Sequence, residues 1–322
     1  MAQTDNKEEL TVWQKVVYHS LFGIWYVLSI LPMWIHYAFS SIVALLLFYV
    51  IRYRRNLVHR NMRDAFPEMS EKQLYKEEYK FYQHFCDIFM ESLKYISISD
   101  KELMARMKMM NMDRVKESYR SGRCVALYLG HYANWEWISS LPLWADIKEV
   151  QCLQLYHPLE NKVFDKIVGY TRERFGGRNI PVNESIRHLV KYKKADKPFM
   201  LGFIADQVPF WNNIHYWTNF LNHPDTPVFT GPEKLMKKFN MDVYYLDVKK
   251  VRRGYYEVEF KLITDDPNSY KDYELTEIYT RMLDETICNA PAYWLWTHNR
   301  WKRTKAEWDK MYDPETGKVF MR

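Results

Sequence analysis

The chain lacks the sequence patterns of several common protein classes. Its four cysteines are far apart and form no C-x-x-C pair, so we expect them to be reduced and mostly buried, as in a chain that faces the cytoplasm. No zinc pattern, helix-turn-helix cue or RNP-like motif accompanies the net charge of +6, which argues against nucleic acid as the partner. The anionic partners that remain are a membrane surface and an acidic carrier protein.

Patterns for covalent and metal-assisted catalysis are also missing. The sequence has no G-x-S-x-G elbow and no cysteine in a catalytic setting, so we expect no covalent enzyme intermediate. No His/Asp cluster has the spacing of metal ligands, so neither a metal nor another cofactor is predicted. A reaction in this protein would therefore depend on general acid–base chemistry.

Charge is absent from one long segment near the N-terminus. Residues 16–51 contain no Asp, Glu, Lys or Arg, whereas a bilayer core needs only about 20 helical residues. A single straight helix of this length would extend about 54 Å, so we expect a kink or break at Pro32. Two arrangements fit: a tight hairpin in the bilayer, or one span plus an interfacial helix. A buried pair of core helices is the alternative to both.

The residues around this segment suggest how the chain is organised. Residues 1–11 form a polar tail, residues 12–51 a membrane-anchoring segment, and residues 52–322 a single domain. Arginines at 52, 54, 55, 60 and 63 follow the apolar segment directly, which places the domain on the cytoplasmic side of a membrane. Aromatic residues make up 17% of the chain, including 12 Trp and 25 Tyr, as suits a protein at a membrane interface.

The most informative segment is residues 123–137, R-C-V-A-L-Y-L-G-H-Y-A-N-W-E-W. Its apolar run predicts a buried strand that ends in a glycine turn. His131 follows this turn, and Asn134 is placed to cap a helix whose first turn carries Glu136. Because open α/β sheets bind ligands beyond the carboxyl ends of their strands, we expect a functional site at His131.

The same segment predicts a specific chemistry. A neutral imidazole at His131 can take a proton from a hydroxyl, and a carboxylate on its other ring nitrogen, here Glu136, would fix the tautomer. The H-x4-[DE] spacing also occurs at His59 and Asp64, in a basic helix-like segment without a preceding strand or glycine. We interpret this second pair as a chance match. A histidine that merely satisfies a helix start is the alternative reading of the first.

Two further strands end in polar residues. The strand at 150–155 leads into a helix that carries Arg172 and Arg174 near its end, and their offset of two places them on different faces, so only one is expected in a site. The strand at 198–205 is followed by Asp206, which could order the loop or bind a substrate hydroxyl. Taken alone, a surface arginine near a helix end explains Arg172 and Arg174 better than a site residue does, whereas a turn-forming aspartate explains Asp206 equally well.

These blocks together resemble a known family. G-H-Y-A-N-W-E-W, the Asn-Lys pair before a helix ending in R-E-R-F-G, A-D-Q, T-G-P-E-K-L and W-T-H-N-R-W-K occur in the order of the late (secondary) acyltransferases of bacterial lipid A biosynthesis, the lauroyl/myristoyl transferases. That family lies within the H-x4-[DE] glycerolipid acyltransferase superfamily. The resemblance covers residues 53–302. It implies a glycerol-phosphate-acyltransferase-like α/β fold, with a mixed sheet flanked by helices behind the N-terminal membrane-embedding segment.

The resemblance also implies a function. His131 and Glu136 would be catalytic, and Arg172, Arg174 and Asp206 would bind substrate. The acyl donor would be acyl-acyl carrier protein and the acceptor a hydroxyl of a lipid A precursor, at the inner (cytoplasmic) membrane of a bacterium. His298, in the C-terminal block, has no carboxylate at the catalytic spacing and is expected to be structural.

Two alternatives remain open at this stage. The acceptor could instead be a lysophospholipid, glycerol phosphate or an amino-acid lipid, because one fold serves many substrates. The chain could also be a catalytically idle lipid-binding protein of the membrane. The presence of both His131 and Glu136 argues against an idle protein, and the loss of a hydrogen bond between them in a structure would revive that alternative. The length of the acyl chain depends on a pocket depth that the sequence does not give.

Overall fold

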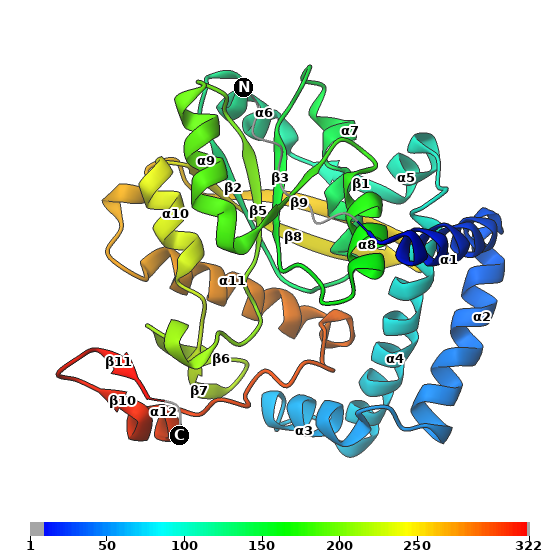
Figure 1. Ribbon diagram of the computed structural model, residues 1–322. Helices are drawn as coiled ribbons and strands as arrows, with labels where there is room; N and C mark the ends of the chain where they lie inside the picture. The colour runs from blue at the N-terminus through cyan, green and yellow to red at the C-terminus, as the bar shows by residue number, and fades with distance from the viewer. Residues whose placement is uncertain (1–9, 321–322) are drawn as a thin grey trace.

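A seven-stranded mixed sheet forms the centre of the molecule in a computed structural model that describes residues 10–320 (Figure 1). Its strand order is β1-β9-β8-β2-β5-β3-β4. The β8–β9 pair is antiparallel and all other pairs are parallel. The strands are β1 (Met107–Met110), β2 (Val125–Leu129), β3 (Cys152–Tyr156), β4 (Arg178–Pro181), β5 (Met200–Ile204), β8 (Asp242–Arg252) and β9 (Tyr255–Thr264). The expected mixed sheet is therefore present.

The central strand β2 shows why the sequence folds in this way. All five of its residues are buried, as expected for a parallel strand that is covered on both faces and therefore reads as one continuous apolar run. The strands predicted at 150–155 and 198–205 correspond to β3 and β5. The apolar runs on either side of Arg253-Gly254 also predict a β-hairpin, and the structure forms it as β8 and β9.

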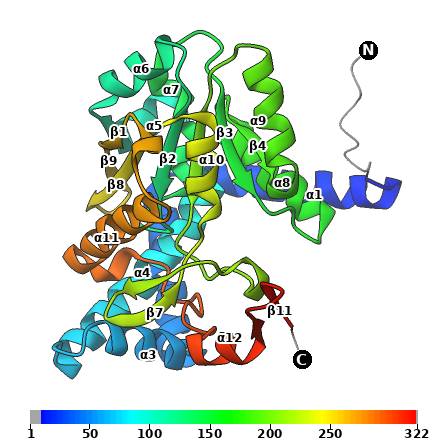
Figure 2. The same cartoon turned by 90° about the vertical axis from the view of Figure 1, so that its left-hand side faces the viewer.

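Helices flank the sheet on both sides (Figure 2). They are α3 (Arg55–Ala65), α4 (Glu71–Lys94), α5 (Asp100–Arg106), α6 (Met112–Arg120), α7 (Pro142–Ala145), α8 (Lys162–Glu173), α9 (Ser185–Lys194), α10 (Gly231–Phe239), α11 (Glu274–Asn289) and α12 (Lys305–Met311). Two small antiparallel ribbons, β6 (Trp217–Phe220) with β7 (His223–Pro227) and β10 (Tyr312–Asp313) with β11 (Lys318–Val319), complete the fold.

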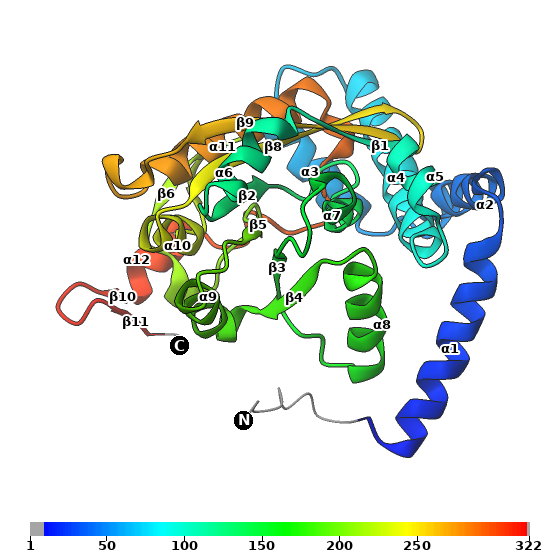
Figure 3. The same ribbon diagram turned by 90° about the horizontal axis from the view of Figure 1, so that it is seen from above.

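The apolar N-terminal segment forms two helices, α1 (Val12–Ile30) and α2 (Met33–Leu45), and α2 continues into one π-helical turn. The predicted break is present, because Pro32 separates the two helices. Figure 3 shows α1 and α2 meeting at a wide angle, so they do not fold back as a hairpin. Met33–Val50 is long and apolar enough to cross a membrane, and 28% of this window is buried. The predicted polar tail lies outside the described residues, except for its last two.

A buried polar cluster attaches α2 to the rest of the fold. Asp87 of α4 accepts hydrogen bonds from Ser40 of α2 (2.6 Å) and from Arg253 at the tip of the β8–β9 hairpin (2.6 Å). Next to it, Gly254 has a φ of +73°, and a β-carbon there would collide with the Tyr37 hydroxyl. Glycine therefore allows both the turn and the close approach of the hairpin to α2.

Candidate active site

The turn that carries His131 is held by the C-terminal part of the chain. The Ala133 amide donates to the Tyr293 carbonyl (2.9 Å), and the Leu295 amide donates to the His131 carbonyl (3.1 Å). A β-carbon on Gly130 would lie 2.8 Å from a methyl group of Leu283, so a larger residue where the strand ends would require that side chain to move. The turn thus has a fixed geometry before any substrate binds.

His131 forms its strongest side-chain contact with Asp206. The register of the parallel strands pairs Leu129 of β2 with Ile204 of β5, and His131 and Asp206 each lie two residues further on. Nδ1 of His131 lies 2.6 Å from Oδ1 of Asp206, and the His131 amide donates to Oδ2 (2.8 Å). The Trp294 indole also donates to Oδ2 (2.7 Å). One carboxylate therefore fixes both the ring and the backbone of His131.

These contacts determine the charge of Asp206. Burial alone would raise the pKa of this carboxyl, but the His131 ring and amide and the Trp294 indole outweigh it and lower the pKa to about 2. Asp206 is therefore ionised at neutral pH. A carboxylate on Nδ1 keeps the proton on that nitrogen and leaves Nε2 as the acceptor of the neutral ring.

Glu136 has a different partner from the one expected. It is paired with Arg172, whose Nε and Nη2 donate to its two carboxylate oxygens over 2.9 and 2.6 Å. Burial raises the pKa of Glu136, but the guanidinium of Arg172 outweighs it and the net shift is downward. The structure thus corrects the predicted pairing, because the side chain lies on a 3-10 helix (Glu136–Ser140) that faces α8, whereas Asp206 already occupies Nδ1 of His131.

The two remaining candidate residues, Arg174 and His298, form hydrogen bonds with the backbone. Arg174 donates to the carbonyls of Tyr95 (2.8 Å) and Ile98 (2.7 Å) at the end of α4, so Arg172 is the arginine of the pair that faces the site. Nε2 of His298 accepts a hydrogen bond from the Val208 amide (3.3 Å). Burial, with the nearby charges, lowers the pKa of His298 to about 4, so this ring is neutral at physiological pH.

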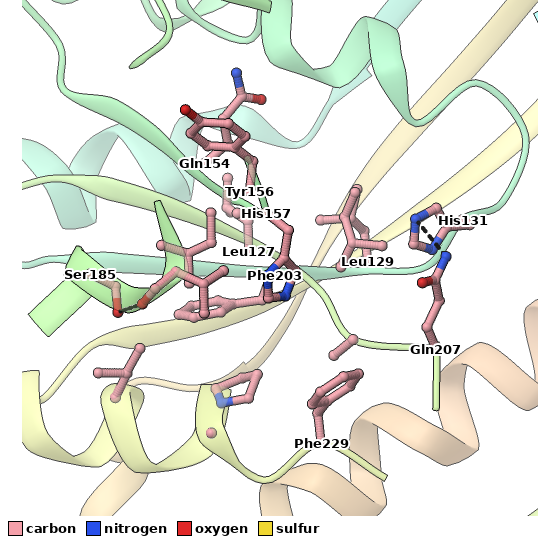
Figure 4. Close-up of a pocket in the computed structure, with 18 of the residues that line it drawn as sticks. Leu127, Leu129, His131, Gln154, Tyr156, His157, Ser185, Phe203, Gln207 and Phe229 are labelled. Carbon is pink, nitrogen blue, oxygen red and sulfur yellow. Dashed lines mark hydrogen bonds between the residues drawn. The ribbon is translucent and has the colours of Figure 1, made fainter. Parts of the chain in front are cut away.

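His131 lies in the wall of a cavity of about 980 Å³. Figure 4 shows the apolar side chains of Leu127, Leu129 and Phe203 between His131 and Ser185, and Phe229 on the segment that precedes α10. The remaining apolar lining comes mainly from β3, β5, α9 and the 3-10 turn before α9, including Leu153, Leu155, Met200, Val182 and Ile186. An apolar cavity of this size with few polar groups at one place suits a ligand with a long hydrocarbon chain.

The charges around the cavity are mostly positive. Glu136 is the sole carboxylate in the lining among the described residues, and Arg172 neutralises it. The other charged side chains in the lining are basic: Lys234, Lys238, Lys302 and Arg303. This excess attracts an anionic ligand.

Part of the site could not be read from the sequence. Asp206 was recognised as a polar residue at the end of a strand, but not as the partner of His131. Its signal was available, because both residues directly follow apolar strands, yet the contact depends on β2 and β5 being neighbours. Gln207, whose amide nitrogen lies 3.3 Å from Nε2 of His131, and Trp294 were not singled out.

The described residues contain no group of three or more His, Cys, Asp or Glu side chains arranged to hold a metal ion. What they do contain is an imidazole that can accept a proton on Nε2, supported by a carboxylate, at the wall of an apolar cavity. Such a pair can activate a hydroxyl for attack on an acyl carbonyl.

Comparison with known proteins agrees with this chemistry. A family model described as bacterial lipid A biosynthesis acyltransferase matches residues 4–303. No match was found among curated proteins. Since the family match spans nearly the whole chain, including both helices of the N-terminal segment and every residue of the site, the protein is an acyltransferase that belongs to the bacterial lipid A biosynthesis acyltransferase family.

Proposed function

We propose that the protein transfers a fatty acyl group from acyl-acyl carrier protein to a hydroxyl of a lipid A precursor at the cytoplasmic face of the bacterial inner membrane. The observation that carries the proposal is the His131–Asp206 pair in the wall of an apolar cavity. The family supplies the acyl-transfer class and lipid A biosynthesis. The carrier protein, the acceptor position and the membrane side are the proposed parts.

The reaction needs one base and one proton path. Nε2 of His131 takes the proton of the acceptor hydroxyl while its oxygen attacks the thioester carbonyl carbon. Asp206 on Nδ1 stabilises the imidazolium that forms. Collapse of the tetrahedral intermediate breaks the carbon–sulfur bond, and the proton moves from Nε2 to the leaving sulfur. The products are the ester and the free thiol of the carrier.

Arg172 and Glu136 belong to the same cavity wall. Two nitrogens of the guanidinium are held by Glu136, which leaves Nη1 for a substrate. In the proposed reaction Arg172 binds the thioester oxyanion or a substrate phosphate, and Glu136 sets its orientation. A guanidinium suits either role because its donors are planar and permanently charged.

The surroundings of the cavity support a membrane-bound, anionic substrate. The unneutralised lysines and Arg303 in its lining fit a phosphorylated lipid or the phosphopantetheine arm of a carrier protein. The outer faces of α1 and α2 expose apolar side chains, among them Trp13 (74%) and Trp34 (70%). In the proposed placement α2 inserts in the membrane and α1 lies along its surface, near the cavity.

An idle lipid-binding protein is the weaker alternative. The predicted His131–Glu136 hydrogen bond is absent from the described residues, and by itself this absence favours the idle protein. The His131–Asp206 bond takes its place, so the need for a carboxylate that orients the imidazole is met by another residue. Lysophospholipid, glycerol phosphate or amino-acid lipid acceptors remain rival substrates of the same mechanism.

Mass spectrometry of lipid A tests the function. The lipid is isolated from cells that lack the protein and from the same cells complemented with wild type or His131→Ala. We expect wild type alone to restore one acyl chain, whose added mass gives the chain length. If wild type leaves lipid A unchanged and instead restores an ester in the phospholipid or amino-lipid fraction, the acceptor is wrong. Restoration by His131→Ala would contradict the mechanism.

A further inference from the structure

The nitrogen of His131 that must act as base already has a hydrogen-bond partner in the free protein. Nε2 of Gln207 lies 3.3 Å from Nε2 of His131 (Figure 4). Gln207 lines the cavity directly after Asp206. In the part of the chain that the structure describes, its amide has no other side-chain hydrogen bond.

The polarity of this contact follows from Asp206. Because the ionised Asp206 holds the proton on Nδ1 of His131, Nε2 of the neutral ring carries only a lone pair. The group that faces it must be a donor, so the side-chain amide of Gln207 presents its N–H and not its oxygen. The amide therefore occupies the position that an attacking hydroxyl must take.

The position of Gln207 is fixed on both sides along the chain. Asp206 is held by three hydrogen bonds from His131 and Trp294. The Val208 amide donates to His298. The side chain of Gln207 is thus the adjustable part of a rigid loop, and rotation of its own torsions can uncover Nε2.

One further contact lies against the ring, but the ring is not fully covered. Trp135 packs edge-on against the imidazole, with ring centroids 5.2 Å apart. The His131 side chain still has 19% of its surface exposed, so water reaches its vicinity. A water on Nε2 would attack a bound thioester in the same way as an alcohol, and would release a free fatty acid and the carrier thiol.

We propose that Gln207 keeps water away from the catalytic base. Its amide N–H binds the lone pair of Nε2 until the acceptor hydroxyl displaces it. A bound acyl thioester is therefore transferred and not hydrolysed. The inference rests on the proposed acyl transfer from a thioester and adds a specificity-determining residue to it. Water is mobile and competes only weakly with the amide for Nε2 of His131. An acceptor that is anchored in the cavity by its other groups brings its hydroxyl at a high effective concentration.

The test measures how acyl groups divide between water and acceptor. Full-length protein in detergent is given lauroyl-, myristoyl- or palmitoyl-acyl carrier protein, with lipid A extracted from cells lacking the protein as acceptor. Free fatty acid and acylated lipid are quantified in the same reaction. Gln207→Met removes the donor at nearly constant volume, and Gln207→Ala removes the bulk as well. Gln151→Met is the matched control, because the Gln151 side chain donates to the Glu149 carbonyl (2.6 Å) and does not line the cavity.

We expect Gln207→Met to raise the ratio of hydrolysis to transfer about fivefold to tenfold, the factor that one hydrogen bond of ordinary net strength carries. Gln207→Ala should raise it at least as much, and Gln151→Met should leave the ratio at the wild-type value. Melting temperatures of the three variants verify that each is folded.

Three results overturn the inference. The first is a wild-type ratio in Gln207→Met. The second is a rise in Gln207→Ala alone, which would assign the effect to bulk. The third is an equal fall of both reactions, which would place Gln207 in the chemistry they share. A wild-type protein that neither transfers nor hydrolyses any of the thioesters would instead overturn the proposed function, and this inference with it.

Discussion

At the scale of single residues, the site consists of two hydrogen-bonded pairs, each with one carboxylate, that have different roles. Asp206 supports the imidazole of His131, and Glu136 holds the guanidinium of Arg172. The pairs share one cavity wall but no hydrogen bond joins His131 to Glu136. This division explains why an H-x4-E spacing can mark a site without giving the contacts inside it.

The second pair leads to a double-mutant prediction. Glu136→Gln and Arg172→Gln should each lower kcat/KM, and the double variant should be little worse than either single one. Because both side chains are about a quarter exposed, at 22% and 28%, we expect a coupling free energy of about 1–2 kcal/mol. Additive losses in steady-state kinetics of the four proteins would contradict the pairing.

Asp206 also predicts how stability depends on pH. Its pKa of about 2 in the folded chain lies below its ordinary value of 3.8. The ionised form therefore stabilises the fold by about 2 kcal/mol above pH 3.8, and this contribution is lost as pH falls through 2. Denaturant unfolding from pH 5 to pH 2 should show a steeper loss in wild type than in Asp206→Asn. Parallel curves would show that Asp206 does not titrate in this way.

At the scale of elements, the parallel register of β2 and β5 creates the site. Each strand ends two residues before its functional side chain, so pairing Leu129 with Ile204 brings His131 and Asp206 together. The hairpin of β8 and β9 reaches across to α2 and fixes the N-terminal segment to the catalytic domain. The elements therefore connect the expected membrane anchor to the sheet that carries the proposed base.

Gly254 tests that connection. Gly254→Ala should destabilise the protein by about 2–4 kcal/mol, because it adds a positive-φ penalty to a collision with Tyr37. Gly122→Ala is the matched control, since Gly122 also has a positive φ of +84° but no atom within 4 Å of the added carbon. It should cost only about 1 kcal/mol. If both variants lose the same free energy of unfolding in chemical denaturation, the hairpin is not in close contact with α2.

Strands, turns and helix breaks were easier to predict from the sequence than contacts between side chains. Apolar runs bounded by glycine, proline or polar residues were sufficient to find β2, β3, β5, the β8–β9 hairpin and the break at Pro32, because these signals are local. The partner of His131 could not be found in this way, since it depends on strand order, which is a long-range property. The helix expected after Asn134 is a 3-10 helix, although the Asn134 side chain accepts from the Trp137 amide as a cap would (3.1 Å).

At the scale of the whole molecule, one side carries the features expected at a membrane. α2 and the π-helical turn that follows it, Met33–Val50, are together long and apolar enough to span a bilayer, and one face of α2 packs on α4, where Ser40 donates to Asp87. The opposite face exposes large apolar side chains, among them Trp34 and Ile42. The family match includes this segment.

Charged substitutions on that face should release the protein from membranes. Ile42→Arg, in the middle of Met33–Val50, is expected to lower partitioning into lipid vesicles about a hundredfold, because an arginine at the centre of a bilayer costs about 3 kcal/mol. Trp34→Arg lies at the end of this span and should lower partitioning less. Met110→Arg is the control, since Met110 is an exposed apolar residue (44%) on the edge strand β1. Vesicle flotation measures the effect, and equal partitioning of all three variants would rule out α2 as the anchor.

The most direct test of the account is the turnover number of purified Asp206→Asn, measured with an acyl-acyl carrier protein donor in the wild-type and His131→Ala backgrounds. We predict that Asp206→Asn lowers kcat by about a thousandfold to ten-thousandfold in the wild-type background, the loss that follows in hydrolase triads when the carboxylate becomes an amide. In the His131→Ala background it should have no further effect. Near-wild-type turnover of Asp206→Asn, or a further loss in the His131→Ala background, would contradict the claim that Asp206 acts through His131.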